Sequence, residues 1–97
     1  MSTAKFLLGT LVATPAALKA IEDSGQQPLD FLSRHQRGDW GDLDTHDRRC
    51  NDDALKDGSR ILSAYTTLKS VKLWIITDGT DDQGRRASTC ILLPEEY

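Results

Sequence analysis

The chain has no long apolar run, no strong excess of either charge and few cysteines. Its N-terminal apolar run, residues 6–13, is interrupted by Gly9 and Thr10. That run is too short and too broken for a secretory signal, and none approaches the roughly 18 apolar residues that cross a bilayer. We therefore expect a soluble protein without a membrane partner.

The few cysteines and the small net charge argue against a disulfide-rich protein and against a nucleic-acid-binding protein. Cys50 and Cys90 lack metal-type spacing and are too few for a disulfide framework, which favours free thiols in a reducing cytoplasm and leaves one disulfide open. The net charge of −3 lacks the basic footprint of a protein that grips phosphate, so direct contact with nucleic acid is disfavoured. With 97 residues and 38% apolar content, residues 1–97 are predicted to form one domain.

Prolines and capping residues indicate three helices. The first begins at Pro15 after a Thr14 cap and ends near residues 24–25, and the second runs from Pro28 to the residue before Gly38. The third is capped by Asp44 or Thr45 and ends near residue 57. The apolar spacing predicts that these helices bury Ala17, Leu18, Ile21, Leu29, Leu32, Leu43, Cys50 and Ala54.

Four segments favour strands, namely residues 6–13, 60–67, 71–77 and 87–93. Segment 71–77 is richest in β-branched and aromatic residues, so we expect it inside the sheet. One strand, three helices and a three-stranded meander predict an α+β fold, with a small antiparallel sheet and helices on one face. The pairing of the first strand is left open.

The stretch from Gly38 to Asp44 separates the second and third predicted helices. Gly38 and Gly41 allow a sharp turn, and the Trp40 indole needs a place to bury its ring. We predict a tight corner that Trp40 and Leu43 pin to the core. The alternative is that Trp40 is an exposed anchor for a partner.

Seven potential metal ligands or catalytic groups fall within residues 35–50. A histidine beside an aspartate could act as a general base, and Cys50 near a histidine could act as a nucleophile. Their spacing matches neither a zinc nor a calcium pattern, and aspartates at a helix start are expected as caps. We therefore predict no catalytic residue, metal site or cofactor among His35, Asp39, Asp42, Asp44, His46, Asp47 and Cys50.

Aspartates crowd residues 39–57, where only Arg48, Arg49 and Lys56 oppose them. A solvated helix face is the simplest interpretation. The more specific hypothesis is that these carboxylates imitate the phosphates of a nucleic-acid backbone and bind a basic groove of a nucleic-acid enzyme. With a second patch in the connection 78–86, the predicted partner-binding residues are Asp39, Asp42, Asp44, Asp47, Asp52, Asp53, Asp81 and Asp82.

Five segments form a distinctive combination: residues 8–18, 32–43, 62–65, 74–77 and 92–97. Together they resemble a family of small proteins carried by plasmids, integrated elements and phages, commonly labelled plasmid-related proteins or type I restriction endonuclease subunit M. Only the connection 78–86 is longer than the family pattern, which marks it as a candidate binding loop. A methyltransferase role is disfavoured, because such enzymes need a longer cofactor-binding domain with a glycine-rich fingerprint.

This resemblance implies a non-enzymatic interaction protein of a mobile genetic element. We expect an inhibitor of a host complex that targets nucleic acid, of the anti-CRISPR or anti-restriction type, acting through the acidic surface on a protein partner. The alternatives are a DNA-associated accessory or regulatory protein and a small metal-dependent hydrolase.

Overall fold

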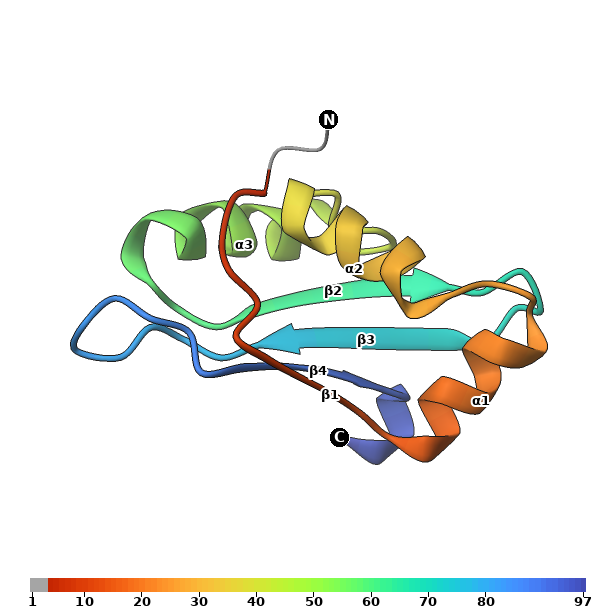
Figure 1. Cartoon of the computed structure of the whole chain (residues 1–97). Coiled ribbons are helices and arrows are strands. Elements are labelled where there is room, and N and C mark those ends of the chain that lie inside the picture. Colours follow the sequence, from red (N-terminus) through yellow and green to blue (C-terminus); the bar gives the residue numbers. More distant parts are fainter. Residues whose placement is uncertain (1–3) are drawn as a thin grey trace.

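The computed structural model describes residues 4–97 as an α+β fold, which confirms the predicted fold class (Figure 1). Residues 1–3 of the predicted domain lie outside the described residues. In chain order, the elements are β1 (Thr10–Ala13), α1 (Pro15–Asp23), α2 (Pro28–Arg37), α3 (Thr45–Asp57), β2 (Ile61–Thr66), β3 (Lys72–Thr77), β4 (Ser88–Leu92) and the 3-10 turn η1 (Pro94–Glu96).

The helices begin and end at the predicted capping residues. The Thr14 side chain accepts a hydrogen bond from the backbone N–H of Ala17, and Asp44 caps α3 in the same way. Gly38 and Gly58 end α2 and α3 with left-handed φ angles of 85° and 82°. Local capping chemistry therefore sets the lengths of the helices that surround the corner.

The strand order is β1-β4-β3-β2, and β3 lies inside the sheet as predicted. The sheet is mixed, because β1 pairs with β4 in parallel while the other two pairs are antiparallel. The predicted antiparallel sheet therefore holds for β2, β3 and β4, whereas the first strand, whose pairing was left open, joins the sheet in parallel. A parallel pair needs a long crossover, and the chain between Ala13 and Ser88 supplies one. The strand predicted at residues 6–13 is also too long, since β1 begins only after Gly9 turns the chain with a φ of 67°.

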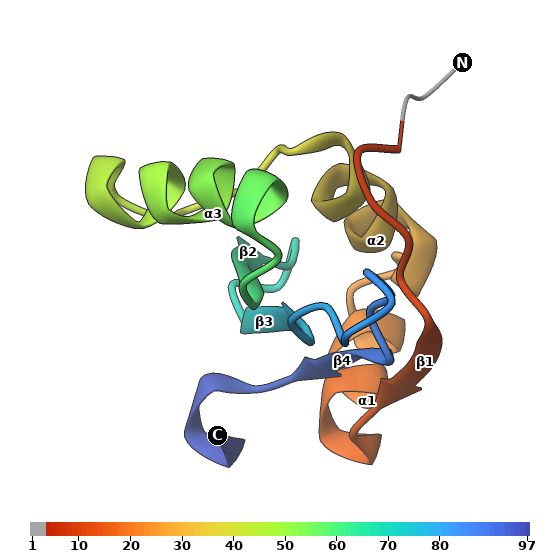
Figure 2. The same cartoon turned by 90° about the vertical axis from the view of Figure 1, so that its left-hand side faces the viewer.

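All three helices bury side chains against one face of the sheet. Ala17, Ile21, Phe31 and Leu32 pack on alternate strand residues in one cluster, and a second cluster contains Trp40, Ala54 and Ile61. Figure 2 shows α2 and α3 over the sheet and the C-terminal turn on its other side. Within residues 4–97, no helix combines the length and the apolar character that crossing a bilayer would require.

Three residues that were predicted to be buried are exposed. Leu18 and Leu29 keep 44% and 66% of their surface accessible, and Cys50 is also exposed. The buried face of α3 is turned by one residue from the prediction, so that the polar Asn51 faces the sheet instead of Cys50. The reason is that the Asn51 side chain donates to the Leu62 carbonyl and accepts from the Leu62 N–H, at 2.7 and 3.2 Å.

Candidate functional site: the Trp40 corner and its carboxylates

The backbone of the corner, residues 38–44, runs along the outer edge of β2. The Trp40 carbonyl accepts from the Ala64 N–H at 3.2 Å, and the Asp42 N–H donates to the Ala64 carbonyl at 2.7 Å. Gly41 lies between them with a φ of 77°, and a Cβ at this position would overlap the Ala64 carbonyl oxygen. Glycine is therefore required at position 41, both for its backbone angle and for the close approach to β2.

The Trp40 side chain is buried, with 5% of its surface exposed. Its ring packs with Ala54 and Ile61, and Leu43 packs against the same cluster. The indole N–H donates to an Asp52 carboxylate oxygen at 3.0 Å, which satisfies the polar end of the ring. This burial agrees with a structural pin and disagrees with an exposed anchor.

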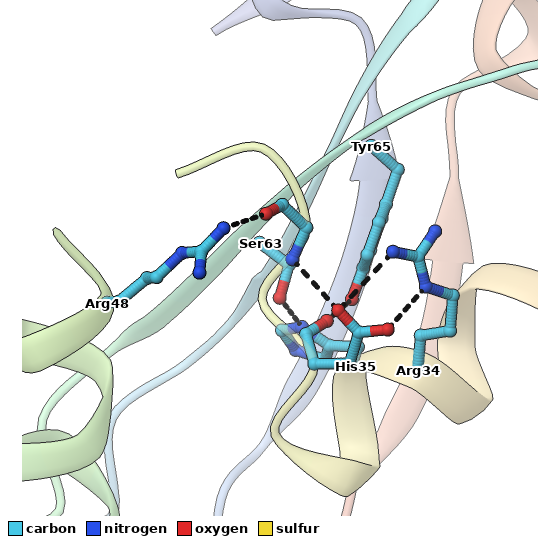
Figure 3. A network of polar contacts seen from close by, with 7 residues as sticks. Arg34, His35, Arg48, Ser63 and Tyr65 are labelled. Carbon is cyan, nitrogen blue, oxygen red and sulfur yellow. Dashed lines mark hydrogen bonds and ion pairs between the residues drawn. The ribbon is translucent and has the colours of Figure 1, made fainter. Parts of the chain in front are cut away.

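Three side chains hold the corner from three different elements, as Figure 3 shows for Arg34 of α2, Tyr65 of β2 and Arg48 of α3. Arg34 pairs with the Asp39 carboxylate at 2.7 Å, and this hydrogen bond holds the pKa of the Asp39 carboxyl below its usual range. The Tyr65 hydroxyl donates to the Asp39 carbonyl at 2.6 Å, while burial raises the pKa of Tyr65 to about 12. The corner is therefore fixed at both its side chains and its backbone.

Beneath the corner, His35 is fully buried and both of its ring nitrogens have partners. Nδ1 lies 2.5 Å from the Ser63 hydroxyl and Nε2 lies 2.8 Å from the Thr77 hydroxyl. The Thr77 hydroxyl lies 2.7 Å from the Thr89 hydroxyl, which donates to the Leu8 carbonyl at 2.8 Å. This polar row ties α2, three strands and the N-terminal segment together.

The directions of these bonds follow from the last donor. Because the Thr89 hydroxyl gives its proton to Leu8, it must accept from Thr77, which in turn accepts from the Nε2–H of His35. Nδ1 is then the acceptor of the Ser63 hydroxyl proton, and the ring is neutral. Burial, with a smaller contribution from the Arg86 charge, lowers the pKa of His35 to about 4. We infer that His35 is a structural residue, since no part of its ring reaches solvent.

The eight aspartates of the predicted partner-binding set are all exposed, but they differ in their contacts. Asp39, Asp42, Asp44, Asp52 and Asp81 accept hydrogen bonds from the protein itself. Among residues 4–97, no hydrogen bond or ion pair involves the carboxylates of Asp47, Asp53 and Asp82. Sequence reasoning identified the acidic surface, but could not tell which carboxylates support the fold.

The seven residues considered as metal ligands are not brought together. In the part of the chain that the structure describes, no group of three or more histidine, cysteine or acidic side chains could hold a metal ion. His46 and Cys50 do meet, with Nε2 and Sγ 3.7 Å apart, but they lie one turn apart on the exposed surface of α3. The predicted neighbours of His35 are replaced by hydroxyls in the core.

A groove of about 900 Å³ was missed by the sequence analysis. It lies between residues 5–11, the end of α3 and the connection 78–86, and combines apolar side chains with Lys5, Lys56, Arg85 and Arg86. The Arg86 guanidinium donates to the carbonyls of Ala54, Ser59 and Asp78, so it also fixes the groove wall. The sequence marked one wall, the connection 78–86, as a candidate binding loop, but it did not predict the groove, because the cations that line it come from three separate segments.

Comparison of the chain with models of known protein families, with curated proteins and with solved structures gave no match.

Proposed function

We propose that this chain is a non-enzymatic interaction protein of a mobile genetic element that docks its acidic surface on a basic surface of a host complex. The inferred target is a nucleic-acid-targeting defence complex of the CRISPR or restriction type. The link to mobile elements rests on the sequence resemblance, and the mode of binding rests on the corner and α3.

The observation that supports this proposal most strongly is that hydrogen bonds within the protein orient some of the exposed carboxylates. Asp42 accepts from the Thr66 hydroxyl at 2.7 Å, and Asp44 accepts from the Asp47 N–H at 2.8 Å. Each carboxylate has further lone pairs for a partner. Because hydrogen bonds already order these side chains, they lose less conformational entropy when a basic partner binds them. Asp47 and Asp53 add carboxylates that the fold does not use.

The test is a charge reversal at positions that do not support the fold. Asp52 is left unchanged, because its carboxylate accepts the Trp40 N–H. A tagged protein would first be used to isolate its partner from host lysate, and the purified partner would then be titrated with wild type and with Asp47→Lys/Asp53→Lys. We expect about tenfold weaker binding at low salt, because exposed charges steer association.

A matched control is available on other surfaces. Glu22→Lys/Glu95→Lys changes the net charge by the same amount at two exposed positions outside the corner and α3. This control should keep the affinity of wild type, and circular dichroism should show that both variants fold. Equal losses in the two variants, or unchanged affinity in both, would contradict the proposed surface.

One observation favours a second candidate, a DNA-associated accessory protein. Lys5, Lys56, Arg85 and Arg86 surround the groove and could contact phosphates despite the net charge of −3. Fluorescence anisotropy with duplex DNA would compare wild type with Lys56→Ala/Arg85→Ala, which spares Arg86. Retention on DNA that weakens in this variant and falls steeply with salt would favour this candidate over protein docking.

A further inference from the structure

The groove between residues 5–11, the end of α3 and the connection 78–86 combines apolar side chains with cations. Phe6, Leu11 and Leu55 contribute apolar surface to it, and Leu11 is 54% exposed. Its volume of about 900 Å³ lies at the upper end of the range of about 300–1,000 Å³ that is usual for small-molecule sites. Such sites typically join an apolar lining to a few polar groups that orient the ligand. The groove therefore suits a small molecule with an apolar body.

The charges on the groove indicate that this molecule is an anion. The charged residues that line it are four cations and one acid, namely Lys5, Lys56, Arg85, Arg86 and Asp57. In the connection 78–86, Asp78 and Asp81 accept hydrogen bonds from the protein itself, and none of Asp78, Asp81 and Asp82 lines the groove. Cations therefore outnumber carboxylates on the lining, although the whole chain has a net charge of −3.

Arg86 is the cation of the groove whose side chain is held in place. Its guanidinium donates from Nη1 to the carbonyls of Ser59 and Asp78, at 2.7 and 3.0 Å, and from Nη2 to the Ala54 carbonyl, at 3.1 Å. Its Cζ atom lies 5.7 Å from the centre of the Phe6 ring, which also lines the groove. Since the guanidinium is already ordered beside an apolar side chain, it loses little conformational entropy when a ligand binds it.

Within residues 4–97, the Arg86 guanidinium forms no ion pair. Asp57 attracts it, but the Asp57 carboxylate accepts the Ser59 N–H at 2.8 Å, and partial burial lowers the pKa of Arg86 below its usual value. A guanidinium has five N–H groups, and the three carbonyls leave one on Nε and one on Nη2 without an acceptor in the described residues. Nε and Nη2 form one edge of the guanidinium, and such an edge can bind both oxygens of a carboxylate.

We propose that the groove binds a small organic anion in which a carboxylate is joined to an apolar body. The carboxylate pairs with the Nε and Nη2 edge of Arg86, and the apolar body lies along Phe6, Leu11 and Leu55. The exposed side chains of Lys56 and Arg85 add positive charge that attracts the ligand. Duplex DNA is a poorer fit, because its phosphate backbone has no apolar part to cover these side chains.

The test uses three probes that separate the charge from the apolar body, namely octanoate, octylammonium and acetate. Binding is followed by NMR of the isotope-labelled protein, including the Nε–H signal of Arg86. Octanoate should bind about tenfold more tightly than octylammonium, which reverses the charge, and than acetate, which lacks the chain. Octanoate should also shift the Arg86 Nε–H signal, whereas octylammonium should leave it in place.

Two leucine variants test the apolar surface. Leu11→Ser changes a groove side chain that is 54% exposed, and Leu29→Ser changes one on α2 that is 66% exposed and does not line the groove. Leu11→Ser should weaken octanoate binding about tenfold, because the chain loses its apolar contact, and Leu29→Ser should bind like wild type. Circular dichroism should show that both variants fold. Equal losses in the two variants would contradict the assigned position of the chain.

Arg86→Lys keeps the positive charge and removes the two-nitrogen edge, so octanoate should bind it about tenfold more weakly. Because Arg86 also holds three carbonyls, the Nε–H signal of wild type tests the contact even if this variant does not fold. Octanoate that binds no better than octylammonium or acetate, or that leaves the Arg86 signal unmoved, would overturn the proposal. Duplex DNA that shifts the groove signals while octanoate does not would also overturn it, and would favour the DNA-associated candidate.

Discussion

The two faces of the sheet differ in a way that reverses the usual arrangement. The helix-covered face contains a buried polar row from Ser63 through His35 to Thr89, although it forms the core. The opposite face, which we call the open face because the three helices lie on the other side, carries two apolar rows: Val12, Cys90, Ile76 and Leu62, and then Ala64, Trp74 and Leu92. The Tyr97 ring and the Arg60 side chain lie over part of it, and Ile76 and Leu92 are buried. The covered face is complete, because every buried side-chain nitrogen and oxygen within residues 4–97 has a hydrogen-bond partner.

The comparison shows that buried polar side chains, and not only apolar ones, determine how the covered face is packed. On the covered face, the polar row has one set of donors and acceptors that can satisfy all of it, so it specifies how α2 sits on the strands. On the open face, the apolar side chains make contacts that have no fixed direction, and the Tyr97 ring packs on Trp74 there. The variants below test the two faces in order of expected effect.

The largest expected effect is at the Trp40 pin of the covered face. Trp40→Ala removes a buried indole and leaves Asp52 without its N–H donor, so we expect a loss of about 3–5 kcal/mol in the free energy of unfolding. Urea denaturation at low protein concentration measures this loss. Trp40→Phe should lose clearly less, because it keeps most of the ring. A Trp40→Ala protein with unchanged stability would contradict the pin.

The next effect is a pH dependence that comes from His35. Its pKa is about 4 in the folded state and near 6.5 when unfolded, so between these values the unfolded chain binds a proton that the folded chain does not. Stability is therefore full above about pH 6.5 and falls by about 3 kcal/mol as the pH decreases towards 4. Denaturation curves at several pH values measure this fall.

The matched control uses the second histidine, which is exposed on α3. His46→Gln should keep the fall in stability, whereas His35→Gln should remove most of it even if that variant is less stable overall. NMR titration gives an independent measurement, in which the His35 ring should remain neutral down to about pH 4. A midpoint near 6.5 for His35 in the folded protein would show that the ring is not held as described.

The smallest expected effect is a difference in stability between variants at two neighbouring residues of β2 that point to opposite faces. Ile61 is fully buried under the helices, and Leu62 is half-buried on the open face. We expect Ile61→Ala to lower the free energy of unfolding by about 2 kcal/mol more than Leu62→Ala. Denaturation of the two variants side by side measures this difference. Equal losses would mean that the open face is as well covered as the core.

Much of the fold could be predicted because its signals are local. Thr14 and Asp44 mark helix starts, Gly38 and Gly58 mark helix ends, and alternation marks the strands. The parallel pairing of β1 could not be predicted, because a four-residue strand carries no local information about a partner some eighty residues away. The same limit applies to the cationic groove, which the fold assembles from distant segments.

The candidate site was predicted in part, for a similar reason. Aspartates crowded around a helix start indicate an acidic surface, but the same residue type also caps helices and accepts from side chains. Asp52 is the clearest case, because only the folded structure brings the Trp40 N–H to its carboxylate. Asn51 was not predicted to be buried, because a polar side chain on a helix is expected to be exposed. Only the folded structure places the edge of β2 where it can hydrogen-bond the Asn51 side chain.

The two cysteines allow the most direct measurement of the difference between the faces. Cys90 lies in the middle of an apolar row on the open face, and Cys50 lies on the exposed surface of α3, so each thiol reports on one side of the molecule. The measurement is the rate of maleimide labelling at each cysteine, followed by mass spectrometry. We expect Cys90 to react more slowly than Cys50, because the Cys90 thiol is only partly exposed and its burial raises its pKa. Equal rates at the two cysteines would contradict the partial burial of the open face.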